Sequence, residues 1–441
     1  MSRLCCMAVS ASFSNVFKES FSQSKFSHDG KHLAVPYGAK VTVYKQSIDL
    51  PETAVFENND NVDVIEWSPD STMILCVILK RKVLQIWSIE DPQWRCKITE
   101  GVMGLSSARW SPDSRHVLSS SDFQIRVTIW SLTSKSISYL KSTKQFIDCF
   151  AFSPSGTVLA VAEYRDSKDF ISIISCEEWD LCKNFEVATE DMGGLAWSPN
   201  GDVLCVWEAP IISFKLFIYD TSGSMLATYH AKSELIGIKS VSWHPEGQLL
   251  LVEGHCDKFV VLDAITWDSL FEWSVPDVIV DADITVYRSP ILPSKSQSDG
   301  PNQYDVIRKR PYSFTNVTRT VDKLKKLSRP TIVKFSATGK HIACTSGEFP
   351  TVVFVIEVES ARCVSLVINA SAVTSLKWAG HAEYLAICTG TKGFHLWSPL
   401  GCTTMPVSCR VPFQAKSCSW NPNGKSLVLH SQEMGIFGTV T

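Results

Sequence analysis

The chain has 441 residues and a nearly balanced charge, with 42 Lys and Arg against 45 Asp and Glu and a formal net charge of -3. This balance excludes a strong global field that would favour nucleic acid or an anionic membrane. None of the 15 cysteines has the paired spacing of a zinc site. Five of them lie singly within apolar runs: Cys76, Cys205, Cys344, Cys388 and Cys418. We expect these five to be small buried residues in a reducing compartment.

The N-terminus carries no recognisable targeting or membrane segment. Residues 1 to 10 contain too short an apolar run for a signal peptide, and we expect a flexible tail there. No stretch of the chain approaches the ~20 apolar residues of a membrane span. Residues 13 to 17 have an apolar pattern but precede the first repeat.

From residue 26 onward the same short phrase returns nine times. It starts with an aromatic residue, continues through Ser or a substitute and a turn containing Pro, Asp, Asn or Gly, and ends in an apolar run. The aromatic anchors are Phe26, Trp67, Trp110, Phe152, Trp197, Trp243, Phe335, Trp378 and Trp420. Most recur every 41 to 46 residues, and one interval of 92 residues separates Trp243 from Phe335.

The composition of each repeat predicts strands. Pro presets φ for the second position of a type I turn, Asp or Asn suits the next position, and Gly closes the turn without steric cost. The runs after the turn, such as 73 to 77 and 248 to 252, are apolar on both faces, as expected for a sheet covered on both sides. Turn signals about every 8 to 12 residues exclude helices of ordinary length.

A repeat in the low forties is typical of a four-stranded propeller blade. Nine such repeats use nearly the whole chain, whereas two rings of seven would need roughly 600 residues. We therefore predict an all-β fold in which residues 11 to 441 form a single propeller of nine blades, with seven or eight blades as the alternative. Each blade packs only on its neighbours, so this length can form one domain.

The long interval contains a change in composition. From about 285 to 328 the chain is rich in Pro, Ser, Asn, Gln and positive charge, and we expect a flexible surface insertion, in which residues 304 to 307 add one local strand. A basic arm for an acidic partner is the functional alternative to a solvated loop. Its candidate partner-binding residues are Arg308, Lys309, Arg310, Lys323, Lys325 and Lys326.

The ninth repeat provides three strands, at about 417 to 420, 426 to 429 and 435 to 437, and is then one strand short. The segment from 13 to 17 has no repeat of its own. We predict that it supplies the missing outer strand and closes the ring, because closure removes an open sheet edge.

The repeats resemble divergent WD repeats, and four longer phrases give a closer match. They are 83 to 101, 13 to 18, 236 to 241, and 385 to 390 running on to 399. In these phrases the chain resembles the centrosomal and spindle-pole WD-repeat family called WD repeat protein eight, encoded antisense to a p53 relative in vertebrates. The match spans nearly the whole chain, including the position of the insertion.

The resemblance implies a non-enzymatic scaffold of the cytoskeleton, at the centrosome or spindle pole body in the cytoplasm. Members of that family act with a coiled-coil microtubule-anchoring protein, and in fungi with a minus-end-directed kinesin. They anchor microtubule minus ends and organise the mitotic spindle, and in animals they are linked to cilium assembly. The family has no catalytic residues to transfer, and the sequence itself shows no catalytic, cofactor or metal motif.

One alternative role remains open. Nine-bladed propellers also occur in eukaryotic translation initiation factors, where they act as scaffolds on the ribosome. An RNA-binding role predicts a strongly basic face, and the near-neutral composition argues against it.

Overall fold

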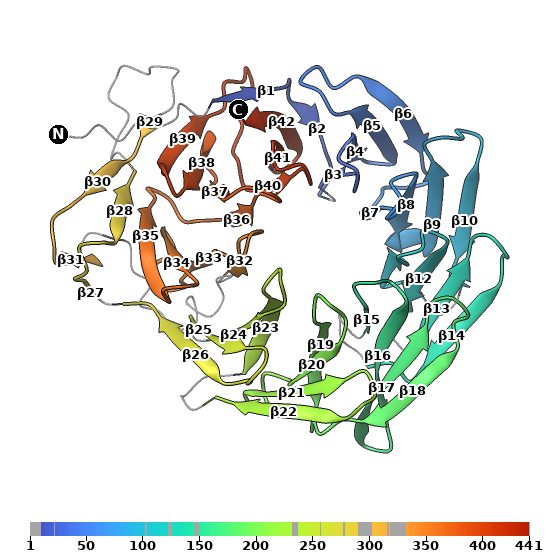
Figure 1. Cartoon of the computed structure of the whole chain (residues 1–441). Helices are drawn as coiled ribbons and strands as arrows, with labels where there is room; N and C mark the ends of the chain where they lie inside the picture. The colour runs from blue at the N-terminus through green and yellow to red at the C-terminus, as the bar shows by residue number, and fades with distance from the viewer. Residues whose placement is uncertain are drawn as a thin grey trace.

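In the computed structural model, nine sheets of four or more strands are arranged as blades around a central channel (Figure 1). The structure describes residues 10–21, 23–101, 104–121, 126–144, 150–231, 237–255, 257–276, 278–289, 302–314, 317 and 332–440. The predicted nine-bladed, all-β propeller is confirmed. The described residues contain one short 3-10 helix, η1 (Leu79–Arg81), and no helix long and apolar enough to cross a membrane.

Blades 1 to 5 follow the first five repeats. Blade 1 contains β3 (Lys25–Phe26), β4 (His32–Tyr37), β5 (Lys40–Lys45) and β6 (Glu52–Glu57). Blade 2 contains β7 (Val64–Trp67), β8 (Met73–Ile78), β9 (Val83–Ser88) and β10 (Arg95–Thr99). Blade 3 contains β11 (Ser107–Trp110), β12 (His116–Ser120), β13 (Arg126–Ser131) and β14 (Ile137–Lys141). Blade 4 contains β15 (Phe150–Phe152), β16 (Val158–Arg165), β17 (Lys168–Ser175) and β18 (Leu181–Glu186). Blade 5 contains β19 (Met192–Trp197), β20 (Val203–Glu208), β21 (Lys215–Asp220) and β22 (Met225–His230).

Blades 6 to 9 complete the ring. Blade 6 contains β23 (Ile238–Trp243), β24 (Leu249–Gly254), β25 (Lys258–Asp263) and β26 (Ser269–Ser274). Blade 7 is built on β32 (Val333–Phe335), β33 (His341–Thr345), β34 (Val352–Glu357) and β35 (Arg362–Ile368). Blade 8 is built on β36 (Ser375–Trp378), β37 (Leu385–Cys388), β38 (Gly393–Ser398) and β39 (Gly401–Pro406). Blade 9 contains β40 (Ser417–Trp420), β41 (Ser426–His430) and β42 (Met434–Val440), completed by β1 (Ala11–Phe13) and β2 (Phe17–Lys18).

The strands of each blade are antiparallel and run from the innermost, beside the channel, to the outermost. One face of the ring therefore carries the turns between first and second strands and between third and fourth strands, and we call it the turn face. The opposite face carries the connections between second and third strands and those between blades, and we call it the loop face.

The repeated phrase forms the first turn of each blade. In blade 2 the Ser68 hydroxyl donates to the Asp70 carboxylate at 2.5 Å and accepts from the Met73 amide at 2.9 Å. Ser71 has a left-handed φ of 65°, where most repeats have Gly. It differs because its hydroxyl accepts the amide of Asp29 from blade 1 at 3.0 Å, so this residue links two blades.

The aromatic anchors join each blade to the one before it. Five tryptophan indoles donate to the carbonyl of the residue that precedes the anchor of the previous blade, over 2.9 to 3.2 Å: Trp67 to Lys25, Trp110 to Glu66, Trp197 to Ala151, Trp378 to Lys334 and Trp420 to Lys377. These bonds hold the innermost strands of adjacent blades at equivalent heights. They explain why Trp is the anchor in these five repeats.

The predicted closure is confirmed. β1 and β2 both pair antiparallel with β42, with Phe13 opposite Gly438 and Phe17 opposite Gly435. A Cβ at Gly435 would lie 2.3 Å from the Phe17 ring, so a side chain there is excluded by the closing strand. The termini of the described chain thus meet in one blade (Figure 1).

In the interval from 285 to 328 the described residues include four short strands, and three of them extend the sheets of blades 7 and 8. β28 (Thr285–Arg288) pairs parallel with β35, and β30 (Asp305–Ile307), predicted locally from the sequence, pairs with β28. β29 (Asn302–Gln303) adds to the edge of β39, while β31 (Tyr312–Ser313) pairs with β27 (Val278–Ile279). A segment with these pairings is not separable as a whole from the fold.

The hydrophobic core lies between neighbouring blades. The largest cluster, for example, joins Phe259 of blade 6 to Phe354 of blade 7. The five cysteines predicted to be buried are all buried and free. Burial raises the pKa of the Cys76 thiol to about 12, so it stays protonated and behaves as an apolar residue.

Candidate interaction surfaces

The predicted basic residues have different roles in the structure. Arg308 and Lys309 are exposed after β30, at the outer edge of blade 7. The guanidinium of Arg310, in contrast, donates to backbone carbonyls: Nε to Asp281 and Nη1 to Ile307, both at 2.9 Å, and Nη2 to Ile284. Arg310 therefore holds two segments of the chain together. Lys323, Lys325 and Lys326 lie outside the described residues.

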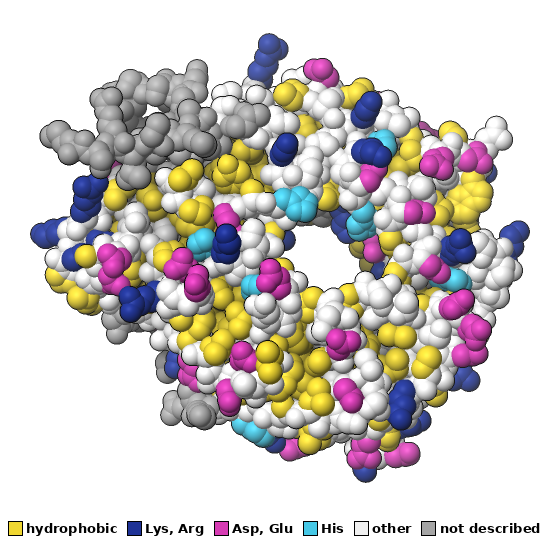
Figure 2. Space-filling view, in the orientation of Figure 1, with side chains coloured by type: hydrophobic (Ala, Val, Ile, Leu, Met, Phe, Trp, Pro, Cys, Tyr) yellow, Lys and Arg dark blue, Asp and Glu magenta, His cyan; other side chains and the backbone are white. Residues whose placement is uncertain are grey.

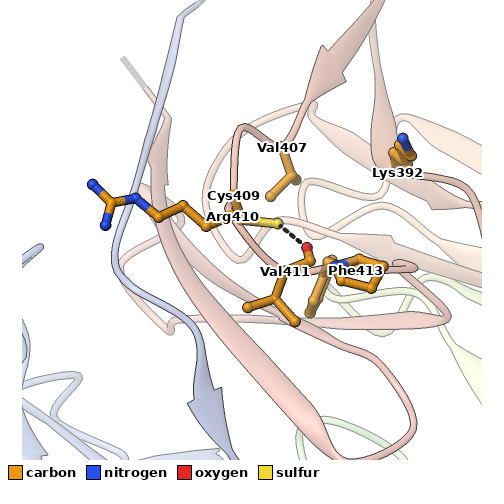
Figure 3. A pocket seen from close by; sticks show the side chains of 7 residues that line it. Lys392, Val407, Cys409, Arg410, Val411 and Phe413 are labelled. Carbon is orange, nitrogen blue, oxygen red and sulfur yellow. Dashed lines mark hydrogen bonds between the residues drawn. The ribbon is translucent and has the colours of Figure 1, made fainter.

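A pocket of about 240 Å³ opens on the loop face between blades 8 and 9. Figure 3 shows Lys392 and Arg410 on opposite sides, with Val407, Val411 and Phe413 between them. Cys409 donates its thiol to the Val411 carbonyl at 2.9 Å, which holds the β39–β40 connection in its bend. The exposed lining of this pocket is mainly polar, and the exposed Lys392 and Arg410 flank it, which suits a polar segment with acidic residues.

Sequence reasoning missed this pocket. Its residues come from two connections that lie outside the repeated phrase, and only the fold brings them together. The one signal available was length, because ten residues, 407 to 416, connect β39 to β40 whereas six, 58 to 63, connect β6 to β7.

A second pocket, of about 280 Å³, lies between blades 7 and 8, and its lining includes Asp283, Tyr287 and His341. The His341 ring contacts the Glu383 carboxylate at 2.7 Å. Burial opposes ionisation of Glu383, but hydrogen bonds from His341 and Thr338 outweigh it and lower the pKa of this carboxyl. The arrangement links blades 7 and 8, and we assign it a structural role.

One polar relay has the composition of a hydrolytic triad. His430 contacts Ser419 Oγ at 3.0 Å through Nε2 and Glu19 Oε1 at 2.9 Å through Nδ1. Glu19 also accepts the amide of Ser24 at 3.1 Å, and both Glu19 and His430 are completely buried where the closing segment joins blade 9. This relay supports ring closure. Within the described ranges, no three His, Cys, Asp or Glu side chains are grouped as metal ligands.

Comparison with known proteins agrees with the fold. The family model described as WD domain, G-beta repeat, matches residues 95–128, which run from β10 of blade 2 into blade 3. The mouse WD repeat-containing protein WRAP73 is 33% identical over 437 residues, covering 96% of this chain and 94% of that protein. This chain belongs to the WD repeat-containing family that includes WRAP73.

Two further comparisons are weaker. The crystal structure of the C-terminal WD40 domain of Sif2 superposes with a TM-score of 0.54 at 11% identity, covering 98% of this chain and 99% of that one, which supports the propeller fold alone. A protein of eukaryotic translation initiation factor 3 from Culex quinquefasciatus is 25% identical over 181 residues, which cover 38% of this chain and 25% of that protein. WRAP73 therefore matches the whole ring, whereas the initiation factor matches only part of it.

Proposed function

We propose that this protein is a non-enzymatic scaffold at the centrosome or spindle pole body that helps anchor microtubule minus ends and organise the mitotic spindle. The observation that carries the proposal is the similarity to WRAP73 along 96% of the chain. The four sequence phrases that resemble the centrosomal WD-repeat family support the same proposal. A role in cilium assembly belongs to the same proposal for ciliated cells.

The architecture is suited to scaffolding because a propeller presents two broad faces made of loops. We propose that the partners are a coiled-coil microtubule-anchoring protein and a minus-end-directed kinesin. The loop-face pocket between Lys392 and Arg410 is the candidate docking point, since two exposed positive charges flank it. The exposed Arg308 and Lys309 provide a second candidate at the outer edge.

Affinity purification of the tagged protein from dividing cells tests the proposal. Recovery of a coiled-coil spindle-pole protein supports it. Recovery of ribosomal particles instead would favour the alternative scaffold role in translation initiation, for which the partial similarity to the initiation factor 3 protein is the specific observation.

Two charge-reversal variants separate the candidate surfaces. One carries Lys392→Glu and Arg410→Glu, and the other carries Arg308→Glu and Lys309→Glu while keeping Arg310, which the fold requires. We expect the first variant to lose the coiled-coil partner and the second to retain it. Retention by the first with loss by the second would assign docking to the edge of blade 7.

A further inference from the structure

One position in each repeat lines the channel, and its charges are unevenly distributed. This is the residue immediately before the aromatic anchor, on the innermost strand. From blade 1 to blade 9 it is Lys25, Glu66, Arg109, Ala151, Ala196, Ser242, Lys334, Lys377 and Ser419. Blades 7, 8, 9 and 1 are contiguous around the ring and carry three lysines and a serine, whereas blades 4, 5 and 6 carry small uncharged residues.

The geometry brings these side chains to one level of the channel. They occupy the same position in each repeat, and at five of the nine blade interfaces an anchor indole bonds the carbonyl of this residue, including Trp378 on Lys334 and Trp420 on Lys377. Lys25, Lys334 and Lys377 are all exposed although they lie on innermost strands. An innermost strand is covered by its neighbouring strand and by two adjacent blades, so its exposed side chains face the channel. Figure 2 shows that the centre of the ring is open.

Charged side chains at adjacent positions of this layer are close enough to affect one another's pKa. Burial raises the pKa of the Glu66 carboxyl, and the charges of Lys25 and Arg109 on either side oppose the shift. Glu66 is the one acidic residue in the layer, against four cations. Among the described residues, neither Lys334 nor Lys377 has a carboxylate within 4.0 Å of its ammonium group, and the nearby Glu383 is already bonded to His341.

We propose that the layer of the channel formed by the residues before the anchors binds an extended acidic polypeptide segment, whose carboxylates contact Lys334, Lys377 and Lys25. Ser419, between the second and third lysines, is small and uncharged, and its hydroxyl is bonded to the buried His430. The small side chains of Ala151, Ala196 and Ser242, in blades 4 to 6, leave room for a peptide backbone in the same layer. A chain, rather than a compact polyanion, suits a passage with charge along one side and small residues along the other. This binding does not depend on the centrosomal role.

Binding of a fluorescein-labelled peptide of ten glutamates to the full-length protein, followed by fluorescence anisotropy, tests the proposal. The variant Lys25→Gln, Lys334→Gln, Lys377→Gln should bind at least about tenfold more weakly, and salt should weaken wild-type binding. The matched control is Lys97→Gln, Lys141→Gln, Lys183→Gln, which removes the same charge from exposed lysines on outer strands of blades 2, 3 and 4. This control should bind within about twofold of wild type.

A second variant adds a negative charge to the same layer of the channel without removing a lysine. Ser242→Glu leaves every lysine in place and adds a carboxylate at the same level, so it should also weaken peptide binding. Equal binding by wild type and the triple lysine variant would overturn the proposal. So would equal losses in the triple variant and its control, or binding of inositol hexakisphosphate without binding of the peptide. Unchanged melting temperatures of the variants show that any loss is not caused by unfolding.

Discussion

The indole N–H of an anchor tryptophan is the group that can bond one blade to the blade before it. Five of these groups donate to the preceding blade, whereas Trp243 Nε1 is buried with no hydrogen-bond partner among the described residues. Since the two kinds of tryptophan differ in this bond, they provide an internal comparison.

Trp67→Phe should destabilise the protein by about 1 to 3 kcal/mol more than Trp243→Phe. Both changes remove similar volume, but only the first leaves the Lys25 carbonyl without its 2.9 Å donor. Urea denaturation of the two variants measures the difference. Equal losses would mean that the anchors act through packing alone.

His395 is the residue whose burial should be visible in the pH dependence of stability. It lies on β38 beneath Tyr304, with ring centroids 5.6 Å apart, and contacts the hydroxyls of Thr389 and Thr404. Desolvation lowers its pKa to about 4 from 6.5. The unfolded chain therefore binds a proton that the folded chain does not, and stability should fall as pH drops from about 6.5 to about 4.

His395→Gln should remove this part of the pH dependence. Between pH 7.5 and pH 5 the wild-type free energy of unfolding should fall by about 2 kcal/mol more than that of the variant. Chemical denaturation at the two pH values provides the comparison. The same decrease in both proteins would show that His395 is accessible to protons in the folded state.

At the scale of elements, the sequence predicted the strands of the repeat, the closing segment and β30, but not β27, β28, β29 or β31. The anchor and turn residues recur, so the inner strands and first turns could be predicted from local sequence. The closing segment could be predicted from its apolar pattern and from the strand missing in the ninth repeat. β27 to β31 have two to four residues each and no anchor, and β28 pairs parallel with a strand far along the chain. Short strands of this kind depend on tertiary pairing, which local composition does not encode.

The candidate sites follow the same division. The basic residues 308 to 310 were visible as a charge cluster, but the structural role of Arg310 depends on carbonyls of residues 281 and 284, which only the fold brings near. The lysines of the channel occupy a fixed place in the repeat, so their common level could have been inferred once the repeat was aligned. The loop-face pocket could not, because its two connections vary from blade to blade.

Replacing the segment after β28 in two steps should show which of its residues contribute to stability. A Gly/Ser linker of equal length in place of residues 290–301 should leave the melting temperature within a few degrees, because loop composition has a weak effect on folding free energy. Extending the replacement to residue 314 removes β29, β30, β31 and the buried Tyr304 and Phe314, and should lower the melting temperature clearly.

Tyr304→Phe refines this test, since it deletes the hydroxyl that donates to Asn369 at 2.7 Å while keeping the ring, and should cost about 1 to 3 kcal/mol. If the longer replacement melts like wild type, these strands contribute nothing to blades 7 and 8.

At the scale of the whole molecule, stability depends on closing the ring. Deleting residues 1–20 removes β1, β2 and Glu19, leaving β42 as an open edge and the buried His430 without its carboxylate partner. The melting temperature should fall by many degrees. Deleting residues 1–9 is the matched control and should leave it unchanged. A similar melt for both truncations would show that the ring is held by the contacts between blades alone.

We propose that this closed ring acts as a scaffold at the spindle pole. Imaging of the fluorescently tagged protein through a complete division, expressed from its own locus, tests that claim most directly. We expect a focus at each pole during mitosis, and spindles with detached minus ends when the protein is depleted. A protein that never visits the pole at any stage of division would contradict the claim.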